Sequence, residues 1–271
     1  MRVAFQGERG AYSEEAIMAH WGEAAEPLPR PYLPDVFDAV EEGDADLGLV
    51  PVENSIEGSI VRTFDLLNER TLRAQGETVL RIVHCLIANS GVEAGDVKRV
   101  FSHPQALGQS REYLERRGLE PVGAYDTAGS VKMIKEQGLM DAAAIASQRA
   151  AEVYGMNVLE KGIETHKENY TRFLVIGRDE PEPTSTDKTS LAFVVEHRPG
   201  TLVKALNALA KRRINLCKIE SRPLVGTPWE YIFFIDFHGH VEDPKVDKAL
   251  VELRGQTRYI KHLGSYPRFT G

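Results

Sequence analysis

The sequence predicts an α/β protein in two parts. The first is a two-lobed α/β domain with a cleft, and the second is a smaller domain of the ferredoxin-like βαββαβ arrangement. Through about 180 residues, short apolar runs alternate with helical patterns, and polar residues stand at the junctions. Residues 181–187, rich in Pro, Glu, Ser and Thr, have the composition of a linker. We expect the first domain at 1–180, with lobes at about 1–78 plus 158–180 and at about 79–157, and the second at 188–271.

The composition is typical of a soluble globular protein, with 42% apolar and 27% charged residues. A net charge of -7 and a pI of about 5.7 argue against nucleic acid or an acidic membrane as a partner. No apolar run reaches the roughly 18 residues of a membrane span, and no signal-peptide pattern precedes the first strand, so we expect a cytoplasmic location. Cys85 and Cys217 lie far apart in apolar contexts, which favours buried free thiols over a disulfide.

The first elements are a strand, a glycine turn and a helix. Residues 2–7 predict a buried strand that enters a glycine turn, and Ser13 is expected to cap a helix that reaches about Trp21. Free backbone N–H groups converge in such a turn, which makes it able to bind an anion. The spacing is neither a phosphate loop nor a dinucleotide fingerprint, so a plain strand-to-helix turn is the alternative.

A second junction carries more polar residues than a helix cap requires. Residues 35–42 predict an amphipathic helix, and residues 45–52 predict a buried strand that ends in the polar segment 53–60. A further helix contains residues 63–67. Ligands bind at the carboxyl ends of strands in open α/β sheets. Amide and hydroxyl groups beside a helix start suit a carboxylate ligand better than a metal ion, although a capped turn without a ligand is the alternative.

The middle of the chain repeats the pattern of strand then helix. Residues 78–88 form the longest strand-like run, which is long enough to carry the chain from one lobe to the other. The other elements predicted here are strands at 97–101, 121–125 and 142–146 and helices at 104–117, from 126 and from 147. This repetition predicts a parallel sheet.

The histidines give little support for metal or nucleophilic chemistry. His103 lies at a predicted helix start without a serine nucleophile elbow or a cysteine partner, so capping or packing is favoured over catalysis. His238 and His240 lack a third donor at metal-ligand spacing, and no metal site is predicted.

The stretch 169–173 brings a hydroxyl, a guanidinium and an aromatic ring to the start of the buried strand 174–177. Thr171, Arg172 and Phe173 therefore form a plausible ligand-facing edge. The alternative is that Thr171 and Phe173 are ordinary strand residues and that Arg172 points to solvent.

The second domain follows the βαββαβ order. Its expected elements are strands at 189–196, 214–224, 231–237 and 257–266 and helices at 201–213 and 244–254. It carries no group of residues suited to covalent chemistry, and strand edges of this fold commonly pair between subunits. Its expected task is binding.

Taken together, several motifs make the chain resemble the monofunctional bacterial prephenate dehydratases that carry a C-terminal ACT regulatory domain. The resemblance covers essentially the whole chain. Its motifs are Gly10-Ala11-Tyr12-Ser13, Asn54-Ser55-Ile56-Glu57-Gly58 with Thr63 and Asp65, Ser102-His103-Pro104-Gln105-Ala106, Asp126 to Ser130, Thr171-Arg172-Phe173 and Glu220-Ser221-Arg222-Pro223. Each motif is weak alone, but their joint order makes coincidence improbable. The resemblance implies a periplasmic-binding-protein-like fold for the catalytic domain.

Two motifs depart from the family pattern. The usual Gly-Pro-x-Gly-Thr turn reads Gly7-Glu8-Arg9-Gly10-Ala11, which adds a charge pair and removes a hydroxyl. The regulatory Gly-Ala-Leu motif reads Gly200-Thr201-Leu202. The first departure bears on substrate affinity, and the second bears on the strength of the effector response.

The resemblance implies an enzyme of L-phenylalanine biosynthesis that expels hydroxide and carbon dioxide from prephenate to give phenylpyruvate. Aromatisation drives this reaction, so no cofactor or metal is expected. By resemblance Thr171 is the catalytic hydroxyl, Arg172 clamps a carboxylate and Phe173 packs beside the ring or under the strand. The other implied substrate-binding residues are Tyr12, Ser13, Asn54, Ser55, Glu57, Gly58, Ser102, His103, Gln105, Thr127 and Ser130.

The implied regulatory domain binds L-phenylalanine at a subunit interface and inhibits the enzyme allosterically. A homodimer or homotetramer through both domains is expected. The implied effector residues are Gly200, Thr201, Leu202, Asn215, Leu216, Glu220, Ser221, Arg222 and Pro223. Two alternatives stay open. The first is a dehydratase that accepts both arogenate and prephenate. The second is a non-catalytic sensor that binds an amino acid.

Overall fold

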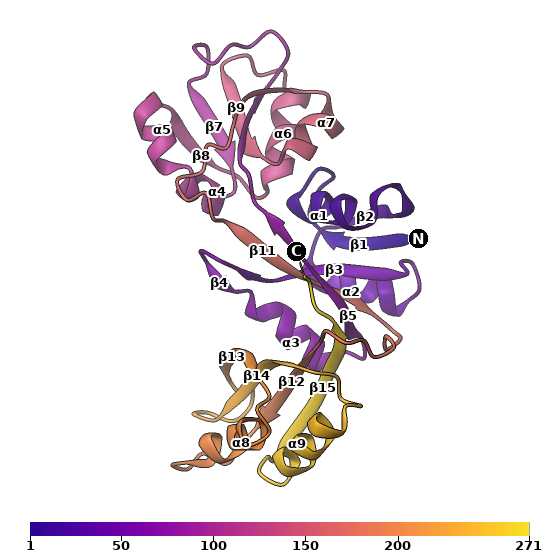
Figure 1. The fold of residues 1–271 in the computed structure, drawn as a ribbon. Helices are drawn as coiled ribbons and strands as arrows, with labels where there is room; N and C mark the ends of the chain where they lie inside the picture. The colour runs from indigo at the N-terminus through magenta and orange to yellow at the C-terminus, as the bar shows by residue number, and fades with distance from the viewer. Residues whose placement is uncertain (271) are drawn as a thin grey trace. The chain divides into compact units, whose positions relative to one another are not determined.

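The structure is a computed structural model that describes residues 1–270, and its strands form three sheets (Figure 1). The chain divides into two compact units. The first unit contains Met1–Gly58 and Val79–Phe173, and the second contains Ser59–Thr78 and the chain from Leu174 onward. The mixed α/β class expected from the sequence is confirmed.

The first sheet has the strand order β2-β1-β3-β11-β5, with the short β4 paired to β3. β1 is parallel to both β2 and β3. β5 and β11 each run from one unit into the other. The strands are β1 Arg2–Gln6, β2 Glu26–Arg30, β3 Leu47–Asn54, β4 Gly58–Ser59, β5 Arg73–Arg81 and β11 Tyr170–Gly177. β2 was not predicted because it contains two prolines, which a strand tolerates at the edge of a sheet.

The helices between these strands are α1 Tyr12–Trp21, the 3₁₀ turn η1 Gly22–Ala24, α2 Leu33–Glu41 and α3 Val61–Glu69. The expectation that Ser13 caps α1 is wrong. The helix already begins at Tyr12, and Ala11 at the cap position makes no side-chain bond. The Glu14 carboxylate, inside the first turn, accepts a hydrogen bond from the Gly10 N–H at 2.8 Å instead.

The second sheet lies in the first unit and has the order β10-β6-β9-β7-β8. β7 is parallel to β8 and β9, but β6 is antiparallel to β9 and β10, so the sheet is mixed rather than parallel as expected. Its strands are β6 Cys85–Ala88, β7 Arg99–Ser102, β8 Glu120–Gly123, β9 Ala142–Ala146 and β10 Asn157–Lys161. Its helices are α4 Pro104–Gln109, α5 Arg111–Arg117, α6 Thr127–Glu136 and α7 Gln148–Tyr154.

Two predicted elements of this unit are each divided in the structure. The run at 78–88 is not one strand, because β5 ends at Arg81 and β6 begins at Cys85 in another sheet. The helix expected at 104–117 breaks at Ser110, which is fully buried and joins α4 to α5. His84, which is buried, lies in the first break, and Gln109 directly precedes the second.

The third sheet belongs to the second unit and confirms the βαββαβ order. Its order is β13-β14-β12-β15, all antiparallel. Its elements are β12 Asp187–Val194, α8 Thr201–Ala210, β13 Leu216–Pro223, β14 Tyr231–His238, α9 Pro244–Arg254 and β15 Tyr259–Pro267. Phe193 and Ile235 pack with α8 and α9 on one face. Phe234 points to the other face, where its ring lies 5.6 Å from that of Phe64 on α3.

The two cysteines differ. Both are free thiols; Cys85 is buried as expected, whereas Cys217 is exposed on the edge strand β13, where the expectation is wrong. Within residues 1–270 no helix is long and apolar enough to cross a membrane.

Candidate active site

A cavity of about 220 Å³ in the first unit collects most of the predicted ligand residues. They come from the ends of β3 and β11, from α1, and from the starts of α4 and α6. The lining residues are Tyr12, Ser13, Pro51, Asn54, Ile82, His84, His103, Gln105, Ala106, Gln109, Asp126, Thr127, Thr171 and Phe173. Apart from His84, His103 and Asp126, their side chains carry no group that ionises readily near neutral pH.

The Asn54 side chain fixes the Thr171 hydroxyl. Its Nδ2 donates to Thr171 Oγ1 at 3.0 Å and to Asn169 Oδ1 at 2.8 Å. Its Oδ1 accepts from the backbone N–H groups of Ile56 and Glu57 at 2.9 and 3.0 Å. The amide therefore cannot turn over, because each end already has two partners. Thr171 Oγ1 accepts this bond, so its own hydrogen remains available to a ligand.

Gln109 joins this group to His84. Its Oε1 accepts from Asn169 Nδ2 at 2.9 Å and lies 2.8 Å from His84 Nε2. Its Nε2 donates to the Glu57 carboxylate at 3.3 Å. On its other side, His84 Nδ1 lies 2.5 Å from the Tyr12 hydroxyl. A continuous polar network thus runs from Thr171 to Tyr12 along the cavity wall.

Burial governs the charge of this network. His84 is 2% exposed, and burial lowers its pKa, although its Gln109 bond and the nearby Glu164 act in the opposite direction. Burial also raises the pKa of Tyr12 well above its ordinary value. The resting network therefore consists of a neutral imidazole and a protonated phenol. Burial raises the pKa of Asp126 as well, while its Oδ1 accepts from the Gly129 N–H and caps α6.

His103 caps α4. Its Nδ1 accepts a bond from the Gln105 N–H at 3.3 Å, which agrees with the capping interpretation of this residue. The ring also lines the cavity beside Gln105. Ser13 and Thr127 reach the same cavity from the first turns of α1 and α6. These first turns surround the cavity with helix N-termini, which favour negatively charged ligand groups.

Other predicted residues lie outside the cavity lining. Arg172 alternates with Thr171 and Phe173 along β11, so it points to the opposite face, and its guanidinium lies 3.7 Å from the Glu53 carboxylate. Ser55 exchanges hydrogen bonds with the backbone of Glu168 and Tyr170. Gly58 is exposed, and Glu57 enters only as the partner of Gln109.

Two predicted serines have structural partners. Ser102 is fully buried and donates to the Ile145 carbonyl at 2.6 Å, which ties β7 to β9. Ser130 donates to the Asp126 carbonyl at 2.7 Å within the first turn of α6. Neither hydroxyl reaches the cavity that contains Thr171.

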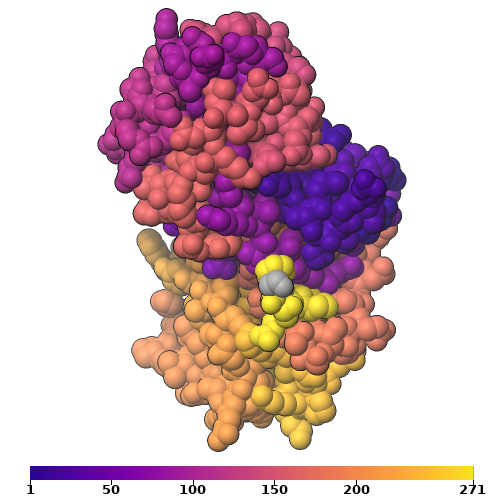
Figure 2. Space-filling view, turned by 45° about the horizontal axis from the view of Figure 1, so that its top comes forward, coloured from indigo at the N-terminus to yellow at the C-terminus, as the bar shows by residue number. Residues whose placement is uncertain are grey.

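The glycine turn holds a buried carboxylate. Glu14 is fully buried and accepts from Arg9 Nε at 2.9 Å and from Arg149 Nε at 3.1 Å. Gly10 has a positive φ of 84°, and a Cβ there would lie 2.5 Å from the Ala150 Cα, so only glycine permits this approach of α1 and α7. In Figure 2 the indigo N-terminal residues adjoin pink residues of the first unit. The charged turn noted in the sequence thus serves to join two parts of this unit.

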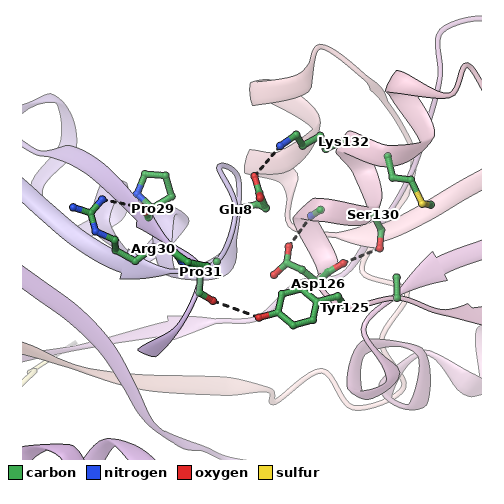
Figure 3. A pocket seen from close by; sticks show the side chains of 12 residues that line it. Glu8, Pro29, Arg30, Pro31, Tyr125, Asp126, Ser130 and Lys132 are labelled. Atoms are coloured by element: carbon green, nitrogen blue, oxygen red, sulfur yellow. Dashed lines mark hydrogen bonds and ion pairs between the residues drawn. The ribbon is translucent and has the colours of Figure 1, made fainter. Parts of the chain in front are cut away.

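A second and larger cavity, of about 450 Å³, lies beside the same turn (Figure 3). Lys132 Nζ pairs with Glu8 at 3.3 Å, and the Tyr125 hydroxyl donates to the Pro31 carbonyl at 3.4 Å. The wall also contains Arg30 and Ser130. Its polar groups are thus largely paired with one another.

The predicted effector residues lie in the second unit. Gly200 precedes α8 with a φ of 82°, and the Thr201 hydroxyl donates to the carbonyls of Glu196 and Arg198. Leu202 and Leu216 pack against the core of this unit. The Asn215 carbonyl accepts from the His238 N–H at 3.0 Å.

The motif Glu220-Ser221-Arg222-Pro223 lies on β13, at the edge of the third sheet. Arg222 Nη2 donates to Asp65 of α3 at 2.9 Å. Lys218, on the same side of β13, donates to the Ser59 hydroxyl at 2.5 Å. β13 therefore contacts the segment that leads into α3.

Sequence reasoning missed His84, Gln109 and Asn169 as members of the site. His84 is the one titratable imidazole in the apolar run 78–88, and Gln109 follows Gln105 by four residues, which places both on one helix face. Asn169 was noted beside Thr171 but was assigned no role. These features are visible in the sequence, but only the structure shows that the three side chains meet in one hydrogen-bond network.

Comparisons with known proteins agree on one family. The family model described as prephenate dehydratase matches residues 3–181, and that described as ACT domain matches residues 189–255. The chain is 42% identical over 278 residues to arogenate dehydratase/prephenate dehydratase 2, chloroplastic, of Arabidopsis thaliana, covering 98% of this chain and 73% of that protein.

Two solved structures are similar over nearly the whole chain. Prephenate dehydratase of Arthrobacter aurescens in complex with L-Phe has a TM-score of 0.90 and 34% identity, and the match covers 99% of this chain and 90% of that one. GqqA, described as a novel type of quorum quenching acylase, has a TM-score of 0.93 and 35% identity, with 100% and 99% covered.

Proposed function

Because the chain belongs to the prephenate dehydratase family, we propose that it converts prephenate into phenylpyruvate, water and carbon dioxide, with feedback inhibition by L-phenylalanine. The observation that carries the proposal is the direction of one hydrogen bond. Thr171 accepts from Asn54, which leaves the Thr171 hydrogen available to a ligand in the cavity.

The reaction requires help for a leaving hydroxyl. As the ring hydroxyl of prephenate departs, negative charge develops on its oxygen, and a hydrogen bond from Thr171 stabilises that charge. Threonine is a weak acid, so its role is orientation and charge stabilisation rather than complete proton donation by itself. Asn54 holds the donor in place before the substrate arrives, which lowers the cost of organising the transition state.

The two carboxylates of prephenate need donors as well. The first turns of α1 and α6, with Ser13 and Thr127, supply N–H and hydroxyl groups at the cavity. Gln105 adds an amide. Arg172 remains a proposed clamp, but a carboxylate would have to compete there with Glu53. We therefore give the larger share of carboxylate binding to the helix starts.

Arogenate is the second candidate substrate, because the Arabidopsis relative is named for both arogenate and prephenate. The two molecules share the ring, the leaving hydroxyl and both carboxylates, and they differ where arogenate has an ammonium group in place of a keto group. Thr171 and Asn54 would act on either molecule in the same way.

The feedback proposal rests on the ACT domain and on the related structure that contains L-Phe. In the second unit, Arg222 and Lys218 of β13 bind Asp65 and Ser59. The segment that joins Asn54 to Ser59 is short. A shift of β13 on effector binding would therefore displace Asn54, which holds the Thr171 hydroxyl. This gives the effector a physical means to change the donor geometry.

We also propose a homo-oligomer. β13 is the outer strand of its sheet, and Ile219 on it is 45% exposed. Unpaired strand edges with apolar side chains are suited to pairing with a second copy. The expected effector motif lies on this strand, so pairing would place effector and interface together.

An acylase function is the rival, given the description of the GqqA structure. Acyl transfer by a hydroxyl needs an adjacent base. The hydroxyl that a histidine contacts in this cavity is the phenol of Tyr12, whose pKa is raised and which is therefore a poor nucleophile.

The test is turnover of three substrates by the purified full chain: prephenate, arogenate and an N-acyl homoserine lactone, each with and without L-phenylalanine. We expect phenylpyruvate from prephenate and a reduced rate in the presence of phenylalanine. Cleavage of the amide bond of the N-acyl homoserine lactone without any phenylpyruvate would overturn the proposal. Turnover that phenylalanine leaves unchanged would remove the feedback claim and keep the catalytic one.

A further inference from the structure

His84 lies where the chain passes from β5 to β6, and its ring is enclosed between α1 and α4. Its backbone is fixed on both sides. The N–H donates to Glu164 at 3.0 Å, and the carbonyl accepts from Gly162 at 2.8 Å. Such a ring cannot turn freely, so the identity of the proton-bearing nitrogen is set by its neighbours.

Gln109 identifies that nitrogen. Its Oε1 already accepts from Asn169, and an amide oxygen can only accept. His84 Nε2, 2.8 Å away, must therefore carry the hydrogen. In a neutral ring, Nδ1 then has the lone pair, and the Tyr12 hydroxyl donates to it at 2.5 Å in preference to the Val83 carbonyl, which lies 3.4 Å away.

The direction of this bond determines what Tyr12 offers the cavity. Its hydrogen is directed to His84, so the phenol oxygen faces a ligand with a lone pair. Prephenate, with its carboxylates ionised, has a single hydrogen-bond donor, the ring hydroxyl. Thr171, at the far end of the same network, offers a hydrogen.

We propose that His84 is a positioning residue, which orients Tyr12 so that the phenol oxygen accepts a hydrogen bond from the ring hydroxyl of the substrate. The leaving oxygen would then be held between a donor, Thr171, and an acceptor, Tyr12. This inference rests on the proposed function. It adds that Tyr12 selects the end of the substrate that carries the ring hydroxyl.

The test is a double-mutant cycle of Tyr12→Phe and His84→Asn with prephenate. Each single change should lower kcat/KM by about tenfold to a hundredfold, as the loss of one hydrogen bond to the transition state does. The double variant should lose little more than either single variant, because His84 acts through Tyr12. Tyr113→Phe, which removes another tyrosine hydroxyl of this unit, and His20→Asn on α1 are matched controls that should stay within twofold of the wild type.

A pH profile separates positioning from a merely structural role. Protonation would put a hydrogen on His84 Nδ1, which the Tyr12 oxygen would then accept, while the Tyr12 hydrogen would turn to the Val83 carbonyl at 3.4 Å or to the cavity. The oxygen would lose the lone pair that it offers the substrate, so kcat/KM should fall on the acid side. That acid limb should be absent in Tyr12→Phe. The titratable group that faces His84 is Glu164, with Lys167 beside it. Those near Tyr12 are Glu15 and Cys85. Gln109 on α4 does not titrate.

The outcomes are distinct. Additive losses in the cycle, or an acid limb that persists in Tyr12→Phe, would overturn the assignment. A loss seen with arogenate alone would show that Tyr12 receives the ammonium group and would also overturn it. Absence of prephenate turnover in the wild type would instead refute the proposed function.

Discussion

At the residue scale, the buried carboxylate of Glu14 shows how the glycine turn is stabilised. Burial by itself would raise the pKa of Glu14, but hydrogen bonds from Arg9, the Gly10 N–H and Arg149 outweigh it, and the pKa falls below 4.5. Between the pKa of Glu14 in the folded chain and its higher pKa in the unfolded chain, the unfolded chain therefore binds more protons. The stabilisation is complete above about pH 4.5 and is lost as the pH falls through the lower folded value.

Replacement of Glu14 by Gln should lower the free energy of unfolding by about 2 kcal/mol at neutral pH, because charge-assisted hydrogen bonds are weakened. The difference from the wild type should shrink below pH 4.5, where the native carboxyl gains its proton. Denaturant unfolding at several pH values measures this difference in the free energy of unfolding. Glu152→Gln, which removes an exposed partner of Arg149, is the control and should change stability by less than about 1 kcal/mol. A pH-independent difference would contradict the linkage.

Single residues also mark the limit of sequence reasoning about the site. Asn54 could be identified because polar groups at the carboxyl end of a strand point to ligands, whereas Thr171, at the start of β11, was identified by resemblance to the family. The opposite direction of Arg172 follows from strand alternation, but only once it is known which face of β11 lines the cavity. His84 was hidden in an apolar run, since a buried histidine has the same sequence signature whether it packs or positions a neighbour.

At the element scale, α3 contacts β13 within the second unit through two side chains. Asp65 pairs with Arg222 at 2.9 Å, and the Lys218 ammonium lies 5.4 Å from the centre of the Phe64 ring. An arginine of the expected effector motif is thus occupied by a helix of the same chain. We expect this pair to transmit the effector response.

Asp65→Asn should weaken inhibition by L-phenylalanine about two- to thirtyfold, the range of a coupling change of about 0.5–2 kcal/mol. The rate without effector should stay within about twofold of the wild type. Inhibition curves at fixed prephenate concentration measure both values. Glu69→Gln on the same helix, which removes the exposed partner of Arg62, serves as the control. An unchanged inhibition constant would exclude the pair from regulation.

Elements with a clear periodic pattern were predictable, and those defined by long-range contacts were not. The βαββαβ order followed from apolar runs of ordinary length and a linker before them. The division of 78–88 did not, because its residues are apolar on both sides of His84 and the change of sheet depends on distant partners. β2, with its two prolines, forms because β1 offers an edge.

At the scale of the whole molecule, each unit has its own expected task. The first unit contains the cavity with Thr171, and the second contains the expected effector motif. The order of motifs along the chain predicted this division of labour. It could not predict which cavity of the first unit collects the predicted residues.

The central claim is that prephenate is dehydrated in the cavity lined by Thr171, rather than in the larger one lined by Tyr125. The most direct test compares kcat for phenylpyruvate formation by Thr171→Ala and Tyr125→Phe in the full chain. We expect a fall of roughly 10²–10³ in Thr171→Ala, as for the loss of one transition-state donor, and a rate near that of the wild type in Tyr125→Phe. A folded Thr171→Ala variant with normal kcat, or a comparable loss in Tyr125→Phe, would contradict it.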